Sequence, residues 1–171
     1  MRWIPSAAAA ALLASCMAVQ MPPPPPPSSG PATPSGSAPS SGQRLVEQMV
    51  EAVNAHRRAA RCPELAWLPE AARAAQAHSD DMARRDYFDH TSPDGQGLAD
   101  RLRVHGVPWR AIAENIALHP GAPRDVLAGW VASPGHRRNL DNCVYTHHGI
   151  GLRDGLWTHV FVTPPPAPAG R

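Results

Sequence analysis

The folded part of this 171-residue sequence lacks an excess of either charge. Residues 43–163 hold all 14 acidic side chains and 14 of the 16 basic ones, and every basic residue is an arginine because lysine is absent. Partners that carry many phosphates, and acidic substrates, are bound by surfaces with a surplus of cations. The charge balance therefore argues against nucleic acid as a partner.

The N-terminus lacks an apolar run long enough to cross a bilayer, because its run ends after residues 7–14. Arg2 precedes that run and small residues follow it, which predicts a signal peptide over residues 1–15. The four residues that end at Cys16 resemble a bacterial lipobox, so we expect Cys16 to be lipidated. The protein is then an exported, membrane-anchored lipoprotein, periplasmic or at the cell surface; with plain signal cleavage it is secreted.

The segment 16–42 lacks the residues that build a core. The first 42 residues hold ten of the 21 prolines, and Arg2 is their one charged residue. Such a composition predicts a disordered, extended linker that lifts the domain off the membrane. A second proline- and alanine-rich stretch at 164–171 is expected to be a disordered tail, which leaves one domain at 43–163.

Cysteine is scarce, and Cys62 and Cys143 are the two that fall inside the domain. Because an exported protein meets an oxidising environment, a disulfide between them is expected, with a reactive thiol as the alternative. Closing so long a loop would contribute roughly 4 kcal/mol to stability in the chain-entropy picture.

Periodic apolar residues indicate a mixture of helices and strands. The second helix is rich in alanine, which permits close packing, and His78 beside its apolar face is expected to be buried and hydrogen-bonded. Asp154-Gly155 predicts a tight hairpin. Helices are expected at 43–60, 68–85, 98–104 and 122–132, with one more turn at 136–140, and strands at 113–118, 150–152 and 156–162.

Three ionisable side chains, His90, Glu114 and His136, stand at the ends of predicted elements or among apolar neighbours. Glu114 follows Ala113 and precedes Asn115-Ile116, so its carboxylate needs a partner or a raised pKa. Two histidines and a carboxylate would bind a divalent metal with open positions, or would form a hydrogen-bonded polar cluster.

Four successive motifs resemble the signatures of the bacterial CAP (SCP-like) domain family. In order along the chain they are Phe88–Gly95, Ala113–Ala117, Trp130–Leu140 and Gly149–Gly151. The resemblance implies an α+β fold, a three-layer α-β-α sandwich. It also implies a groove lined by two histidines and two acidic residues, which in several members hold zinc or another divalent metal.

His90, Glu114 and His136 match three of those four groove positions, and Ser133 stands at the second acidic one. A hydroxyl is a poor metal ligand, so the metal, if bound, is expected on His90 and His136. His159 stands where glutamine is common among bacterial members, and is expected to add a ligand to the groove or to cover its wall.

The leading hypothesis is a cell-surface binding module whose groove takes a small ligand, lipid or peptide. The alternative is a metal-dependent hydrolase, although no His-Glu-x-x-His, Gly-x-Ser-x-Gly or Cys-His arrangement is present. A third reading makes His90, Glu114 and His136 an internal network that fixes the fold.

Overall fold

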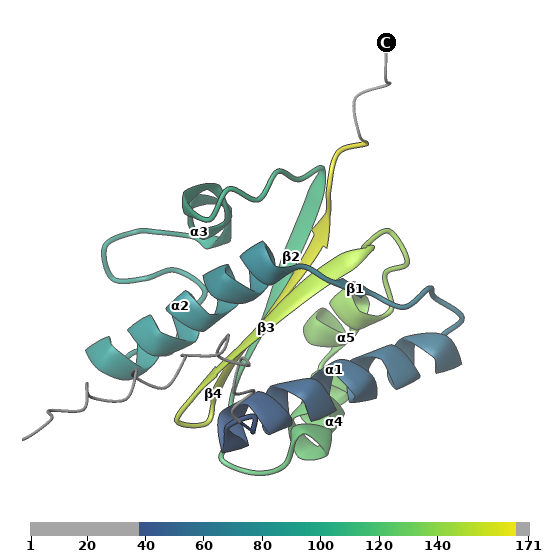
Figure 1. Cartoon of the computed structure of the whole chain (residues 1–171), viewed down its shortest axis with the longest axis horizontal. Coiled ribbons are helices and arrows are strands. Elements are labelled where there is room, and N and C mark those ends of the chain that lie inside the picture. The colour runs from purple at the N-terminus through teal and green to yellow at the C-terminus, as the bar shows by residue number, and fades with distance from the viewer. Residues whose placement is uncertain (1–37, 167–171) are drawn as a thin grey trace, which may run out of the picture. The chain divides into compact units, whose positions relative to one another are not determined.

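The structure, a computed structural model, describes residues 38–166 (Figure 1). The predicted signal peptide, the expected lipidation at Cys16 and most of the predicted linker and tail lie outside these residues. No helix within 38–166 is long and apolar enough to cross a membrane. The elements in order are α1 (Ser41–Ala59), β1 (Ala66–Trp67), α2 (Pro69–Arg85), α3 (Leu98–Val104), β2 (Ala111–Leu118), α4 (Pro123–Ala132), α5 (Pro134–Leu140), β3 (His147–Arg153) and β4 (Leu156–Thr163).

The four strands form one sheet in the order β1-β3-β4-β2. β1 is parallel to β3, and the other pairs are antiparallel. β3 and β4 form a hairpin through Asp154 and Gly155, whose φ angles are +49° and +82°. Positive φ at both central residues is the requirement of the predicted tight turn, so that prediction is confirmed.

Helices cover both faces of the sheet, which makes the predicted three-layer α-β-α sandwich (Figure 1). On one face, α2 and α3 pack on alternate residues of β4 such as Val160 and Val162. On the other face, α1, α4 and α5 bury a larger core around Trp130, Ile150 and Phe161. Each strand therefore presents an α2/α3 side and an α1/α4/α5 side.

The backbones of α2 and β3 approach closely because β3 has glycine where it faces α2. A Cβ atom built on Gly149 would lie 2.1 Å from the backbone nitrogen of Ala72, and one built on Gly151 would lie 2.4 Å from that of Gln76. A side chain at either position would push α2 away. The glycines of the Gly149–Gly151 motif are thus required by helix–sheet packing, and the alanines of α2 allow it.

Three predicted boundaries differ from the observed ones, because a helix cap or pairing with a neighbouring strand determines where the element begins. α1 begins two residues earlier than predicted, because Ser40 and Gln43 form a capping box. α5 begins at Pro134 rather than His136, because proline is well suited to the first turn of a helix. β3 begins at His147 rather than Ile150, since pairing with β1 and β4 extends it.

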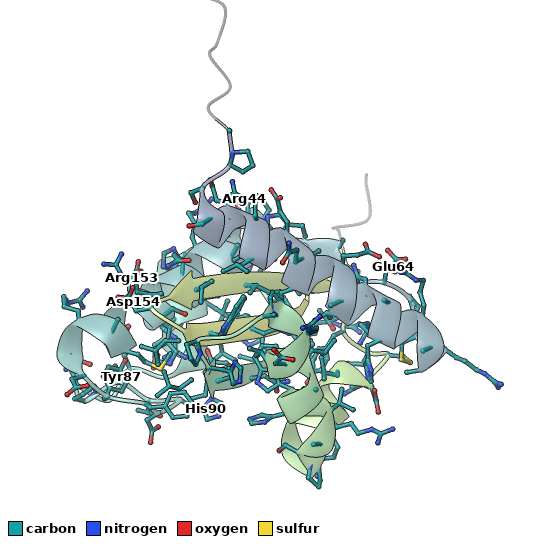
Figure 2. All side chains as sticks on the ribbon, turned by 90° about the horizontal axis from the view of Figure 1, so that it is seen from below. Arg44, Glu64, Tyr87, His90, Arg153 and Asp154 are labelled. Atoms are coloured by element: carbon teal, nitrogen blue, oxygen red, sulfur yellow. A yellow bond between two sulfur atoms is a disulfide. The ribbon has the colours of Figure 1, made fainter. Side chains whose placement is uncertain are left out.

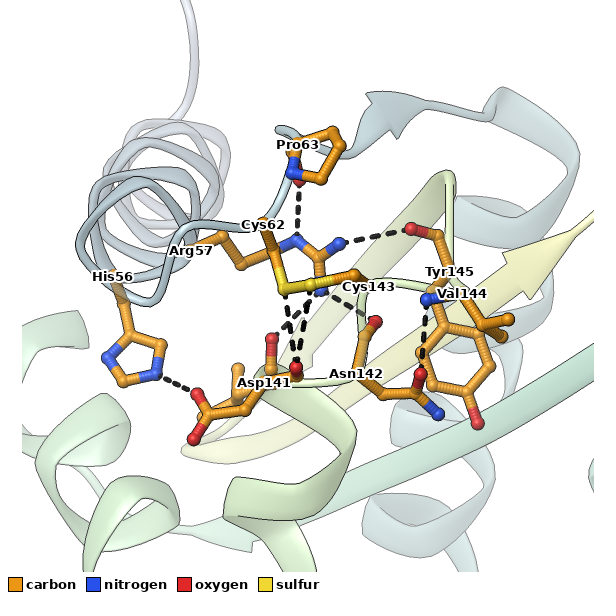
Figure 3. The surroundings of a disulfide bond; sticks show 10 residues. His56, Arg57, Cys62, Pro63, Asp141, Asn142, Cys143, Val144 and Tyr145 are labelled. Carbon is orange, nitrogen blue, oxygen red and sulfur yellow. Dashed lines mark hydrogen bonds and ion pairs between the residues drawn. A yellow bond between two sulfur atoms is a disulfide. The ribbon is translucent and has the colours of Figure 1, made fainter.

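The predicted disulfide joins Cys62 to Cys143 and pins the loop between α5 and β3 to the end of α1 (Figure 3). The same loop is held by Arg57, whose buried guanidinium donates hydrogen bonds to four backbone carbonyls on either side of the disulfide. Burial lowers the pKa of Arg57. The disulfide and Arg57 therefore fix the route by which the chain passes from α5 into β3.

Candidate functional site

His90 and Glu114 are brought together although 24 residues separate them. His90 lies in the loop after α2, and Glu114 lies near the middle of β2. The Nδ1–H of His90 donates to Glu114 Oε1 at 2.9 Å. The His90 side chain is 52% exposed whereas that of Glu114 is 3% exposed, so a buried carboxylate orients a histidine that faces solvent. Figure 2 shows His90 on the opposite side of the molecule from α1.

Arg101 supplies the second partner of Glu114. Its Nη2 lies 2.7 Å from Glu114 Oε2, and its side chain is 5% exposed. Its Nη1 also donates to the backbone carbonyls of His90 and Gln96, at 3.1 and 3.2 Å. Arg101 therefore neutralises the buried carboxylate and ties the His90 loop to α3 and β2. Sequence reasoning required a partner for Glu114 but did not identify it.

His78, in α2, holds the loop that carries His90 through a backbone hydrogen bond. It is buried as predicted, and its Nε2–H donates to the carbonyl of Asp89 at 3.0 Å. Burial lowers the pKa of His78, which favours the neutral ring. His78 is a structural residue that helps to place the adjacent His90.

His136 reaches the site from the opposite face of β2. It lies in the first turns of α5, and Asn115 Nδ2 donates to its carbonyl at 3.1 Å. Asn139, one turn further along α5, donates to Asn115 Oδ1 at 2.8 Å and to the Glu114 carbonyl at 3.4 Å. These amide contacts hold α5 against β2 at the edge of the sheet.

The environments of His90 and His136 shift their pKa values in opposite directions. The hydrogen bond to Glu114 raises the pKa of His90. Burial lowers the pKa of His136, and the positive charge of His90 lowers it further. Near neutral pH the site therefore presents one histidine biased toward the cation and one biased toward the neutral ring.

Ser133, the residue at the second acidic position, precedes α5 as its N-cap residue. Its backbone carbonyl accepts from Arg137 N, but its side chain makes no capping hydrogen bond. The structure thus places Ser133 one helical turn before His136, and brings His90, Glu114 and Arg101 into direct contact without it.

The donor set does not fit a resident divalent metal at Glu114. Both carboxylate oxygens are already engaged, one by His90 and the other by Arg101, whose charge would repel a cation. Within residues 38–166 no group of three or more His, Cys, Asp or Glu side chains is placed to hold a metal ion. That leaves His90 and His136 as candidate ligands, without a free carboxylate oxygen of Glu114 to join them.

His159 lies elsewhere than expected. It is fully buried on the α1/α4/α5 side of the sheet, where its ring is 5.7 Å from that of Trp130 and 3.9 Å from that of Phe161. The expectation that it adds a ligand to the groove or covers its wall is therefore wrong. Two-residue alternation along β4 points it into the core.

The other edge of the sheet carries a different kind of cavity. A pocket of about 690 Å³ lies between α1 and α2 beside β3. Val46, Val50, Ile150 and Leu152 make it apolar, and Trp67, which is 43% exposed, also lines it. Because β2 and β1 are the two outer strands, this pocket and the His90–Glu114 contact lie at opposite edges.

Arg101, Asn115 and Asn139, the polar residues that complete the site, are only weakly indicated by the sequence. Arg101 follows Leu98 by three residues and precedes Leu102, a spacing that places it on the buried face of its helix. Asn115 and Asn139 fall inside two of the four motifs. A charged residue on an apolar helix face was the signal that would have identified Arg101.

The α-β-α sandwich, with His90, Glu114 and His136 around strand β2, is the arrangement that the resemblance to SCP-like domains implies. The family model described as CAP, the cysteine-rich secretory protein family, matches residues 50–155, which is more than half of the chain. The chain belongs to the CAP family.

Relatives of this chain include two Bacillus subtilis proteins, described as uncharacterised protein YkwD and uncharacterised membrane protein YlbC. YkwD is 34% identical over 128 residues, which cover 74% of this chain and 50% of YkwD. YlbC is 36% identical over 99 residues, which cover 58% of this chain and 29% of YlbC. The chain therefore spans half or less of these relatives, and their complete activities are not transferable.

Solved structures share the fold. An extracellular Bacillus anthracis protein containing an SCP domain is 34% identical with a TM-score of 0.69, over 74% of this chain and 45% of that one. An outer surface protein of Borrelia burgdorferi is 14% identical with a TM-score of 0.67, over 74% of this chain and 97% of that one. The first supports the family assignment, and the second shows the fold alone.

Proposed function

We propose that this protein is an exported binding module, displayed at the cell surface by a lipid anchor on Cys16, and that its ligand binds at His90. Support for export comes from the N-terminal sequence and from the description of the Bacillus anthracis neighbour as extracellular. The observation that carries the binding site is the chain Arg101–Glu114–His90, which ends in a half-exposed ring.

The chemistry of that ring indicates an anionic ligand group. Glu114 and Arg101 cancel each other's charge, so protonation of His90 leaves one net positive charge at the site. Glu114 uses Nδ1, which leaves Nε2 to donate to a ligand. A carboxylate or a phosphate of a small molecule, peptide or lipid headgroup would accept that hydrogen bond. His136 is biased toward the neutral ring and would accept or donate a second one.

Preorganisation is the physical advantage of this arrangement. The Glu114 carboxylate is buried and held at both oxygens, so His90 keeps its orientation before a ligand arrives. A donor that is fixed in advance loses little conformational freedom on binding. If His90, Glu114 and His136 served only to stabilise the fold, there would be no reason for the His90 ring to be 52% exposed.

The apolar pocket between α1 and α2 does not extend this site, because it lies at the opposite edge of the sheet. A lipid bound through its headgroup at His90 would keep its acyl chains outside that pocket. The proposal is therefore specific to the polar group that the ligand presents.

A metal-dependent hydrolase on His90, His136 and Glu114 is the alternative. It requires Glu114 to be available as a ligand or a general base. With one oxygen bonded to His90 and the other to Arg101, Glu114 is poorly suited to either role. The contacts of Glu114 therefore favour binding over hydrolysis.

Isothermal titration tests the proposal with three probes: cell-wall peptide fragments with free carboxylates, phosphatidylglycerol vesicles and neutral phosphatidylcholine vesicles. We expect an anionic probe to bind at pH 6, and to bind more weakly at pH 8.5 because His90 loses its proton as the pH rises through its raised pKa. His90→Ala should lower the affinity by about tenfold or more, equal to roughly 1.4 kcal/mol. The matched control, His105→Ala at the end of α3, should bind as the wild type does.

Failure of both anionic probes to bind the wild-type protein would contradict the proposal. Binding that is equal in His90→Ala and His105→Ala would place the site elsewhere on the domain.

A further inference from the structure

A second pair of histidines lies inside the core, on the face of the sheet opposite to Glu114. His148 in β3 and His159 in β4 are both 0% exposed. His148 Nδ1 lies 3.2 Å from His159 Nε2, and the ring centroids are 5.3 Å apart. Neither the groove nor the disulfide uses these rings, so their role is separate.

The two neutral rings share one proton between the facing nitrogens, whichever ring carries it. The outer nitrogens, His148 Nε2 and His159 Nδ1, are buried and have no hydrogen-bond partner within residues 38–166. Uptake of one further proton would bury a cation with two unpartnered N–H groups. Uptake of two would put an N–H on both facing nitrogens and break the bond between the rings.

Among the residues that the structure describes, no carboxylate acts on the pair to stabilise a proton there. Trp67 of β1, Trp130 of α4 and Phe161 of β4 pack around the rings. The charged group that faces them from α1 is Arg57, and His147 is the neighbouring titratable residue on β3. The carboxylate whose charge acts on Arg57 is that of Asp141, which is engaged by His56 and Arg137.

We propose that the His148–His159 pair is a proton-operated switch, which keeps the α1/α4/α5 layer packed on β3 and β4 at neutral pH and releases it in acid. Because the rings are fully buried between these layers, a proton reaches them only when the layers separate. The open form then binds protons that the packed form excludes, and acid shifts the population toward it.

The direction of the pH effect on stability follows from the histidine pKa values in the packed and unfolded states. An unfolded histidine has a pKa of 6.5; burial lowers the pKa of His148 to about 4, and it lowers that of His159 well below 6.5. The pair therefore imposes no protonation penalty on the domain well above pH 6.5, and stability is lost progressively as the pH falls below that value. At pH 5.0 each released ring favours the open state by about thirtyfold, so the two rings together favour it by about a thousandfold.

Urea unfolding at pH 7.5 and pH 5.0 tests the switch in wild type, in His159→Gln and in the control His105→Gln. Glutamine at 159 keeps a hydrogen-bonding side chain beside His148 but cannot take up a proton. We expect the rise in the unfolding equilibrium constant from pH 7.5 to pH 5.0 to be about thirtyfold smaller in His159→Gln than in wild type. His105→Gln should keep most of the wild-type rise, because its ring is not fully buried. Equal rises in wild type and His159→Gln would overturn the proposal.

Amide hydrogen exchange of the wild-type protein gives a second test that needs no variant to fold. The opening equilibrium of the slowest amides in β3 and β4 should increase by about a thousandfold or more between pH 7.5 and pH 5.0. An increase of less than about thirtyfold would mean that the buried rings do not control opening.

Discussion

Two histidine contacts of this domain, His90–Glu114 and His148–His159, lie on opposite faces of one sheet and have opposite electrostatic surroundings. His90 is half exposed and bonded to a carboxylate, which raises its pKa. His148 is bonded to another histidine in an aromatic core, where burial lowers its pKa to about 4. Residue type and hydrogen bonding are shared, so the difference comes from burial and from the charge of the partner.

The comparison shows how the same side chain serves two purposes in one fold. At the β2 edge, the hydrogen bond to the buried Glu114 carboxylate favours the cationic form of His90 at the surface. Between β3 and β4, His148 and His159 are buried, and no carboxylate of residues 38–166 acts on them. A cation is therefore unfavourable in the core. The first arrangement suits ligand binding, and the second suits a response to acid.

Loss of Arg101 should break the exposed site most severely. Arg101→Met keeps much of the side-chain volume but leaves the Glu114 carboxylate buried with His90 as its one charged partner. We expect the free energy of unfolding to fall by about 3 kcal/mol, as is typical when one member of a buried ion pair is removed. The matched control is Arg103→Met on the same helix, whose exposed pair with Asp100 should be worth under about 1 kcal/mol. Urea unfolding at pH 7 measures both, and equal losses would contradict the assigned role of Arg101.

Loss of the Glu114 charge should have a smaller effect. Glu114→Gln leaves an oxygen that can still accept from Arg101, so we expect a loss of about 1–2 kcal/mol at pH 6. The raised pKa of His90 means that its contact with Glu114 stabilises the domain fully below pH 6.5 and loses that contribution as the pH rises through the raised value. The loss in Glu114→Gln should therefore be larger at pH 6 than at pH 9. A loss that is independent of pH would show that His90 is not coupled to Glu114.

Local sequence signals predicted the elements that local interactions determine. The helix Leu98–Val104 has the bounds that were predicted, and Gly106, with a φ of +69°, ends its turn. The hairpin at Asp154-Gly155 and the Cys62–Cys143 disulfide were also correct. In each case turn chemistry, or the scarcity of cysteine, left few alternatives.

Tertiary contacts decided what the sequence left open. The partner of Glu114 comes from a helix 13 residues earlier, and no local pattern links the two. His148 was missed because the strand was predicted to begin at Ile150, whereas pairing with β1 extends it to His147. The role of His159 was misjudged because its inward direction depends on the register of β4, which the motif alone does not determine.

The most direct test of the opposed environments is an NMR titration of the histidine ring protons in the wild-type domain. We predict that His90 titrates with a midpoint above 6.5, whereas His148 and His159 keep the chemical shifts of neutral rings down to about pH 5. In Glu114→Gln the midpoint of His90 should move down, and the buried pair should be unaffected. A His90 midpoint at or below 6.5, or a buried ring that titrates between pH 6 and 7, would contradict the account.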